Sequence, residues 1–412
     1  MYDPLGLSIG TTNFVAVRAG EPPVTHRSLL TLFPHRAPQV GAPTEHPDIT
    51  ETGLLIDGFV ERVGEPAPLV ASDGSAHQPD LLLVDAIEAM VNATGAAPSQ
   101  LAIAVPAHWP PAAWEALQQA LQTHAGLSTL GAPPHLVSDA VAALAALHAD
   151  RGMASSGVVA LLDFGGGGTN ITLADAASDF QPIDETLRYR QFSGNFIDQA
   201  ILAYILGSAD QGDDTTPGGT TAVGDLGQLT DECRQAKERL STQTATELVV
   251  ELPAYHTRIA LTRAEFEDLI RDPLDGVVAA LEGMLQHNKI DWHDLAAVAT
   301  VGGGAHIPLI TERLSARHRV PVVTSQQPAL TIAVGAALCA AREAEDTEAA
   351  PATAMAAAVT SAATTAGLRS RDSGVDGPGS AAPHDLAWSQ EEIRPGDEPL
   401  PFAGEPYGND LD

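Results

Sequence analysis

Three glycine-rich loops carry the residues of this sequence that could do chemistry, and each follows a short apolar run. They are GTTN at 10–13, GGGG at 165–168 and GGG at 302–304. Glycine lets backbone N–H groups approach an anion closely, so such a loop can hold a phosphate, although the same residues also form ordinary tight turns. Any one of the loops fits either interpretation. Three of them at strand ends in an α/β chain favour a nucleotide-binding cleft.

Charged groups that could accompany such a cleft are few. Asp163 stands two residues before the second loop and offers a carboxylate. Only two lysines occur, Lys237 and Lys289, so a polyanionic ligand would depend on backbone amides, a metal ion or one well-placed cation. Lys237 is therefore a candidate, although a lysine on a helix surface is more often simply solvated.

Composition excludes several classes of partner. The chain has 53 acidic and 21 basic residues, a net charge of −32, which repels a nucleic-acid backbone over most of the surface. Its two cysteines, Cys233 and Cys339, give neither a disulfide framework nor a metal cluster. The sequence shows no basic and apolar leader and no apolar run long enough to cross a bilayer. We therefore expect a cytoplasmic protein without a membrane segment.

The elements that must position the loops are short buried strands alternating with amphipathic helices. The chain is 44% hydrophobic but only 4% aromatic, which predicts an α/β interior of Ala, Val, Leu and Ile. A helix should begin near Ile307 or Pro308, directly after the third loop. Residues 343–412 are rich in Ala, Pro, Gly and acidic residues and are predicted to form a disordered acidic tail.

A weak internal repeat relates the first two loops. LGLSIGTTNFVAV and ALLDFGGGGTNITLA both read as a strand, a turn ending in Thr-Asn and a second strand. Aligned, Ser8 falls on Asp163 and Gly10 on Gly165. The repeat predicts two similar halves that present their loops to a shared cleft, although two glycine hairpins can also agree by coincidence.

The order of the motifs resembles a known family. The chain carries LGLSIGTTNFVAV, LAIAVPAHWPPAAWEALQQALQTHAGL, PHLVSDAVAALAAL and ALLDFGGGGTNITLA, followed by QFSGNFIDQAIL, CRQAKERLSTQT, LTRAEFEDLI, VGGGAHIPLI and PALTIAVGAALCAA. These segments resemble, in the same order, those of the heat-shock-70 (DnaK-type) chaperone ATPases over residues 1 to about 342.

This resemblance implies an actin-like ATPase fold, an α/β architecture of two lobes, each with a mixed sheet flanked by helices, around a nucleotide cleft. Within one nucleotide-binding domain over 1–342, lobe I would take about 1–152 plus 329–342, and lobe II about 153–328. A hinge between the lobes would couple nucleotide state to lobe closure. The expected ligands are ATP or ADP with Mg²⁺.

The resemblance also assigns roles to single residues. Asp163 would be the catalytic carboxylate and would help to hold Mg²⁺, and Asp139 would reach the metal through water. A helix N-cap is the alternative role for Asp139. The nucleotide would contact Gly10, Thr11, Thr12, Gly165, Gly166, Gly167, Gly168, Gly194, Lys237, Ser241, Gly302, Gly303, Gly304 and His306.

Several positions depart from the family pattern. Ser8 replaces the aspartate that organises magnesium, and Pro68 stands where the family has its catalytic lysine. In the second loop, Gly168 replaces a threonine and Asn170 an aspartate. On the adenosine side, the departures are Arg234 for a ribose-binding glutamate, and Glu238 and His306 for two adenine-stacking arginines. The departures thus fall on the metal, the attacking water and the base.

Two functions follow as hypotheses. One is a divergent heat-shock-70-like protein that binds ATP or ADP, hydrolyses ATP slowly and has a chaperone-related or regulatory role. The other is a pseudo-ATPase, a scaffold or interaction module without ATP turnover. Kinases of sugars or acetate that share the fold form a third and less favoured class. Beyond the nucleotide, protein partners would bind through the lobes or the acidic tail.

Overall fold

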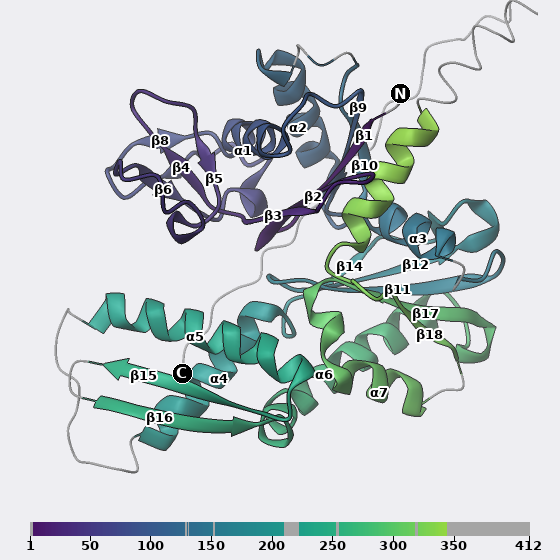
Figure 1. Ribbon diagram of the computed structural model, residues 1–412. Coiled ribbons are helices and arrows are strands. Elements are labelled where there is room, and N and C mark those ends of the chain that lie inside the picture. Colours follow the sequence, from purple (N-terminus) through teal and green to yellow (C-terminus); the bar gives the residue numbers. More distant parts are fainter. Residues whose placement is uncertain are drawn as a thin grey trace, which may run out of the picture. The chain divides into compact units, whose positions relative to one another are not determined.

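The structure is a computed structural model of the chain. It describes residues 3–343 except 128–129, 131, 151–152, 210–221, 253–254 and 318–319 (Figure 1). Nearly all of the predicted tail over 343–412 therefore lies outside the described residues. The described residues fall within one compact unit, Met1–Ala352. Within this part of the chain, no helix combines the length and the apolar character that a bilayer span requires.

The first lobe is built on a five-stranded mixed sheet in the order β10-β9-β1-β2-β3. Its strands are β1 (Pro4–Ile9), β2 (Asn13–Arg18), β3 (Val24–Arg27), β9 (Gln100–Val105) and β10 (His135–Ser138). Smaller strands and two helices accompany it: β4 (Leu30–Leu32), β5 (Gln39–Val40), β6 (Leu54–Ile56), β7 (Leu69–Val70), β8 (Ala76–His77), α1 (Pro79–Ala93) and α2 (Pro111–Thr123). Buried leucine, isoleucine and valine side chains of β1, β9, α1 and α2 form one core.

The second lobe is built on a six-stranded mixed sheet with β13-β12-β11-β17-β18 in order and β14 also paired with β12. Its strands are β11 (Val158–Phe164), β12 (Thr169–Asp175), β13 (Gln181–Pro182), β14 (Leu187–Tyr189), β17 (Leu295–Val301) and β18 (Val322–Thr324). The hairpin β15 (Ala245–Leu252) and β16 (Tyr255–Thr262) and four helices complete the lobe: α4 (Gly194–Ala209), α5 (Ala222–Thr242), α6 (Arg263–His287) and α7 (Pro308–Arg317). The start of α7 confirms the predicted helix after the third loop.

The two sheets share one topology, which confirms the internal repeat. In each, an antiparallel hairpin (β1–β2 or β11–β12) is extended by two parallel strands, β9 and β10 or β17 and β18. The N–H of Gly10 donates to the carbonyl of Asn13, and that of Gly165 to the carbonyl of Gly168, both at 3.1 Å. Gly10 and Gly165 are thus equivalent, as predicted.

The Thr-Asn ends of the two turns are not equivalent, so that part of the alignment is wrong. Each hairpin closes after four loop residues, with Ile9 paired to Phe14 and Phe164 paired to Thr169. Thr12 therefore lies within its loop, whereas Thr169 lies in the strand that follows the second loop. The register of the sheets, rather than the shared letters, sets the correspondence.

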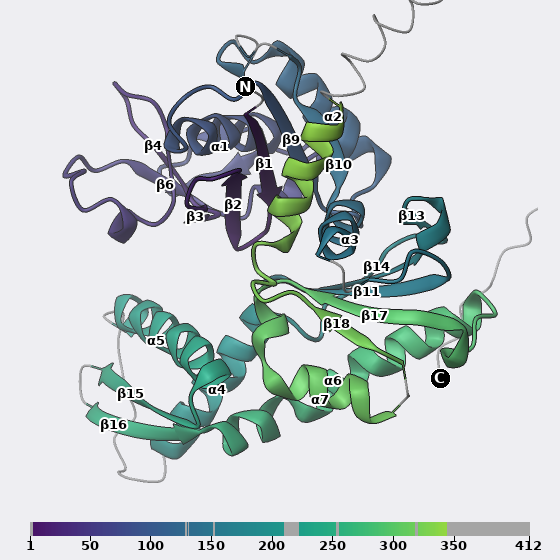
Figure 2. The same ribbon diagram turned by 45° about the vertical axis from the view of Figure 1, so that its right-hand side comes forward.

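Two helices lie between the sheets: α3 (Asp139–Ala149) and a helix over 331–343, coloured yellow-green in Figures 1 and 2. They meet β9 through a cluster of small side chains that includes Ala102, Ala142 and Ala336. Gly335 lies so close to the backbone of Ala142 that a Cβ there would collide with its carbonyl oxygen. The alanine-rich composition is thus used where helices approach one another closely, as the scarcity of aromatic residues suggests. The predicted lobe boundaries stay a prediction.

Candidate functional site

Two adjoining cavities lie where the glycine loops of both lobes meet. The first, here called the loop cavity, has a volume of about 150 Å³ and is lined mainly by Ser8, Gly10, Thr11, Thr12, His108, Asp139, Asp163, Gly165, Gly166, Asn170, Arg188, Gly302 and Gly303. The second, here called the helix cavity, has about 130 Å³ and is lined by residues of α4 and α5, including Gly194, Asp198, Arg234, Lys237, Glu238 and Ser241, together with Gly304. Because both cavities share Thr12, Gly165 and Gly166, they are two parts of one cleft.

Backbone amides of both loops are available to a ligand. Among the described residues, no hydrogen bond uses the N–H of Thr11 or Thr12 in the first loop, or of Gly166 or Gly167 in the second. All four residues are partly exposed. Successive free N–H groups in a turn form a concave site for an anion. Two such sites thus lie on the two loops that border the loop cavity.

Two acidic side chains face the loop cavity. Asp163 is the residue before the last of β11. Asp139 is the first residue of α3, with Ser138 at the N-cap position, so Asp139 is not the cap itself. The Oδ1 atom of Asp139 accepts a hydrogen bond from the Ala107 N–H at 2.9 Å. Burial raises the pKa of both carboxyl groups, and the negative charge of Asp163 raises that of Asp139 further. The pair therefore holds a proton more readily than ordinary aspartates do.

A guanidinium group shares this cavity. Arg188 lies on β14 directly opposite Asn170 of β12, and its Nη1 donates to the Asn170 Oδ1 at 3.0 Å. Asn170 in turn donates from Nδ2 to the Asp163 Oδ2 at 3.3 Å. His108 also lines the cavity, but burial and the two nearby arginines lower its pKa to about 4, so it is neutral at pH 7. Arg188 is the cation that lines this cavity within the described part of the chain.

The helix cavity holds its lysine in an ion pair. The Lys237 Nζ lies 2.7 Å from the Asp198 Oδ1 and donates to the Gly194 carbonyl at 3.1 Å. Both side chains are largely buried, with 15% and 8% of their surfaces exposed. The ammonium group is thus fixed at the junction of α4 and α5, next to Ser241, which donates to the Lys237 carbonyl.

The structure brings most of the predicted site residues together. Of the predicted set, Gly168 is buried beside Arg188, and Gly167 lines a third cavity together with Asp57 and Glu61. His306 is exposed on the turn after the third loop and lines neither cavity of the cleft. Pro68 is exposed as well. Whether these residues bind a nucleotide stays a prediction.

Sequence reasoning missed three charged residues of the cleft: Arg27, Arg188 and Asp198. Arg27 is the last residue of β3 and lines the helix cavity. Arg188 reaches the loop cavity because β14 pairs with β12, where its partner Asn170 lies 18 residues earlier in the chain. The only sequence signal for Arg188 was an arginine within a short β-like run, and such a run does not reveal its pairing partner.

The residues of the cleft fit a nucleotide with Mg²⁺. Four free N–H groups and a guanidinium suit phosphate oxygens, and glycine at the loops leaves the backbone accessible. The two carboxylates are the oxygen ligands that a hydrated magnesium ion prefers. Asp163 and Asp139 are therefore the groups that would hold the metal. The guanidinium of Arg188, in the same cavity, would balance part of the negative charge of the phosphates.

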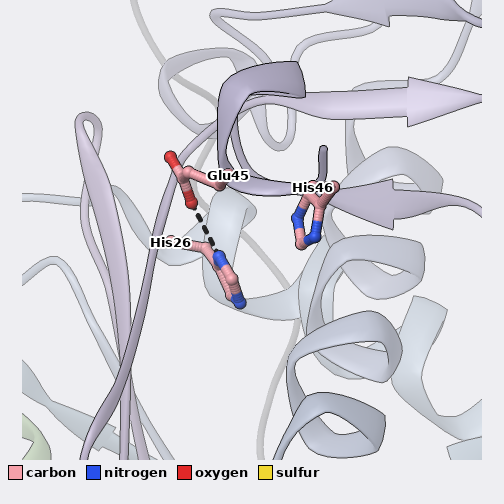
Figure 3. A group of neighbouring side chains, drawn as sticks. All are labelled: His26, Glu45 and His46. Atoms are coloured by element: carbon pink, nitrogen blue, oxygen red, sulfur yellow. Dashed lines mark hydrogen bonds and ion pairs between the residues drawn. The ribbon is translucent and has the colours of Figure 1, made fainter. Parts of the chain in front are cut away.

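A separate cluster in the first lobe joins His26, Glu45 and His46 (Figure 3). The His26 Nδ1 lies 2.7 Å from the Glu45 Oε2, as the dashed line in Figure 3 shows. The His46 Nε2 lies 2.7 Å from the Val40 carbonyl oxygen, so this nitrogen is already used in a hydrogen bond. We therefore interpret the cluster as a structural link between β3 and the turn that contains Glu45.

Comparisons with known proteins agree with this architecture. The family model for Hsp70 protein matches residues 81–350. A protein of Methylibium petroleiphilum described as a chaperone protein HscA homolog is 28% identical over 236 residues, which cover 57% of this chain and 36% of that protein. A protein of the same description from Pseudomonas paraeruginosa is 24% identical over 375 residues, 81% of this chain and 57% of that protein.

This chain thus spans less than two thirds of the length of these relatives. Its two repeated sheets, with glycine loops facing one cleft, are the actin-like ATPase fold that the sequence predicts. Because the family model covers more than half of the residues, the chain belongs to the Hsp70 protein family.

Proposed function

We propose that this protein binds ATP and ADP in the cleft between its glycine loops, and that it hydrolyses ATP slowly. The observation that carries the proposal is the set of free N–H groups of Thr11, Thr12 and Gly166 around a cavity that also holds a carboxylate pair; the fourth free N–H group belongs to Gly167, which lines the neighbouring cavity. Such groups bind phosphate without needing a lysine, of which the cleft has only Lys237, already paired with Asp198.

The two cavities divide the nucleotide between them. The phosphates lie in the loop cavity, against the amides of Thr11, Thr12 and Gly166, and the nucleoside lies in the helix cavity, near Lys237 and Ser241. Asp163 and Asp139 are the residues that would hold magnesium. When bound, the metal neutralises phosphate charge. Arg27 and Arg234 line the nucleoside end, where planar guanidinium groups can stack on a base.

Asp163 is the group that acts in hydrolysis. Burial raises its pKa, which makes its carboxylate a better acceptor for the proton that water loses when it attacks the terminal phosphorus. The new P–O bond forms as the bond to the bridging oxygen breaks, giving ADP and inorganic phosphate. Turnover is slow because Ser8 and Asn170 leave the site with fewer negative charges for the metal.

A pseudo-ATPase is the second candidate. The observation that favours it is that Arg188 and Asn170 form a hydrogen-bonded pair beside Asp163. A cation so close to the carboxylate that would accept the proton opposes the uptake of that proton. In this case the cleft binds the nucleotide but does not turn it over, and lobe closure alone passes the signal to a partner.

The biological role that we propose is chaperone-related or regulatory. It is supported by membership of the Hsp70 family and by similarity to proteins described as HscA chaperone homologs. Proteins bound through the lobes or the acidic tail would be the partners. Cys233 and Cys339 are free thiols, which fits the cytoplasm as the site of action.

Calorimetric titration of the purified protein with ATP and ADP, in the presence of magnesium, tests the binding. Saturable binding supports the proposal, and no heat at millimolar nucleotide would overturn it. Single-turnover hydrolysis of radiolabelled ATP then separates the two candidates. If Asp163→Asn abolishes hydrolysis while the exposed control Asp48→Asn keeps it, the protein is an ATPase. Equal background rates in all three proteins identify the pseudo-ATPase.

A further inference from the structure

Arg188 is held at the loop cavity by its place in the sheet. It is the middle residue of β14 and pairs with Asn170 of β12, the strand that follows the second glycine loop. Its side chain is only 12% exposed. A residue at this register must project its side chain alongside that of Asn170, because paired residues of neighbouring strands lie on the same face of a sheet. The guanidinium is therefore positioned by backbone pairing rather than by a mobile loop.

The contacts of this guanidinium leave two of its three nitrogens without hydrogen bonds. Nη1 donates to the Asn170 Oδ1 at 3.0 Å, whereas Nη2 approaches the Glu61 Oε1 only to 3.7 Å. The Nε and Nη2 atoms are buried and have no hydrogen-bond partner among the described residues. Buried N–H donors in proteins nearly always have an acceptor. These two therefore point to an acceptor that is not part of the chain.

The two unpaired nitrogens lie beside the second glycine loop. A Cβ on Gly167 would lie 2.9 Å from the Arg188 Nη2, and one on Gly168 would lie 2.7 Å from its Nε. The unpaired nitrogens thus lie over a loop that borders the loop cavity through Gly165 and Gly166. The guanidinium fits beside this loop because neither Gly167 nor Gly168 has a side chain. This explains why Gly168 stands where the family pattern has a threonine.

The charge of the site identifies the chemical class of the acceptor. Arg188 is the cation that lines the loop cavity in the described part of the chain, and Pro68, where the resemblance expects a lysine, is exposed on a loop. An arginine with two free N–H groups next to free backbone amides matches a tetrahedral oxyanion. In a cleft that holds a nucleotide, that oxyanion is the terminal phosphate.

We propose that Arg188 binds the terminal phosphate of a nucleoside triphosphate and makes the cleft prefer ATP to ADP. This inference rests on the proposed function. It deepens it by naming the residue that distinguishes the two nucleotides. Asn170 orients the guanidinium through its hydrogen bond. The aspartate that the family pattern has at this position would instead form an ion pair with Arg188.

Calorimetry with ATP, ADP and adenosine tests the inference on four proteins: the wild type, Arg188→Gln, Arg188→Lys and the control Arg258→Gln. Arg258 is exposed on β16 and lines neither cavity of the cleft. We expect Arg188→Gln to weaken ATP binding about 10- to 100-fold. ADP should lose less than about threefold, and adenosine nothing. Arg188→Lys should restore part of the ATP affinity, and Arg258→Gln should match the wild type.

Two outcomes overturn the inference while the proposed function stands: unchanged ATP affinity in Arg188→Gln, or equal weakening of ATP, ADP and adenosine, which would reveal a merely structural role. Absence of nucleotide binding by the wild type overturns the proposed function itself. Circular dichroism and thermal unfolding of each variant, measured without nucleotide, establish that the folded proteins are compared.

Discussion

Substituting Gly168 by alanine is a direct test of how the second glycine loop accommodates Arg188. The added Cβ would lie 2.7 Å from the Nε and 2.9 Å from the Cζ of Arg188, and 3.1 Å from the carbonyl oxygen of Tyr189. Gly168 does not occupy the left-handed region of φ, so alanine brings no backbone strain. The overlap is relieved when the guanidinium moves away from Asn170.

The size of the effect follows from these contacts. Losing the hydrogen bond between Arg188 and Asn170 costs about 1.5–3 kcal/mol, because one partner is charged. Replacing glycine by alanine regains about 0.4–1 kcal/mol through the lower entropy of the unfolded chain. We expect Gly168→Ala to destabilise the protein by about 1–2 kcal/mol, a fall in melting temperature of about 2–8 °C for a lobe of this size.

A double-mutant cycle with Arg188→Ala isolates the contact. In the Arg188→Ala protein the added methyl group meets only the Tyr189 carbonyl oxygen, so Gly168→Ala should be close to neutral, and the coupling energy should be about 1.5–3 kcal/mol. Differential scanning fluorimetry of the four proteins measures it. Gly303→Ala is the control, since a Cβ there meets nothing within 4 Å. Additive effects of the two substitutions would show that the added methyl group does not act through the guanidinium of Arg188.

Three further predictions concern the rest of the cleft and its frame. Asp139→Asn keeps an oxygen that can accept the hydrogen bond from the Ala107 N–H, but it removes a carboxyl group whose pKa is raised by burial. The folded wild type holds this proton more tightly than the unfolded chain does, so its free energy of unfolding should fall as the pH rises above about 4. Thermal melts from pH 4 to 8 should show a flatter pH dependence for the variant. Lys237→Met leaves Asp198 buried and unpaired, so it should cost about 3–5 kcal/mol in urea unfolding, and Asp198→Asn added to it should recover part of that loss. Gly335→Ala should reduce the soluble yield sharply, because its Cβ would collide with the backbone of α3; a normal yield and melting temperature would show that the two helices can separate without cost.

The sequence was most informative where local pattern and global fold agree. The hairpins around Gly10 and Gly165 could be predicted because glycine turns between apolar runs are local features, and their duplication implied two similar sheets. The helix at Pro308 followed from a proline at a helix start. The one error, the matching of the two Thr-Asn pairs, arose because letters rather than strand register were aligned.

The charged residues of the cleft were harder to predict. Arg188 and Asp198 enter the site through the pairing of β14 with β12 and the packing of α4 on α5, which are not encoded by neighbouring residues. Lys237 was identified, but its ion pair with Asp198 was not. Comparing positions with a family pattern reveals which residues are lost. It does not reveal a residue such as Arg188 that reaches the same cavity from another strand.

Hydrogen exchange of the loop amides, measured by mass spectrometry with and without saturating ATP, shows whether the two glycine loops hold the phosphates. We expect ATP to slow exchange in peptides covering 10–13 and 165–168, since the N–H groups of Thr11, Thr12, Gly166 and Gly167 then donate to phosphate oxygens. The exposed turn at 72–74 should exchange at an unchanged rate. ATP binding that leaves both loop peptides unprotected would contradict the assignment of these loops as the phosphate site.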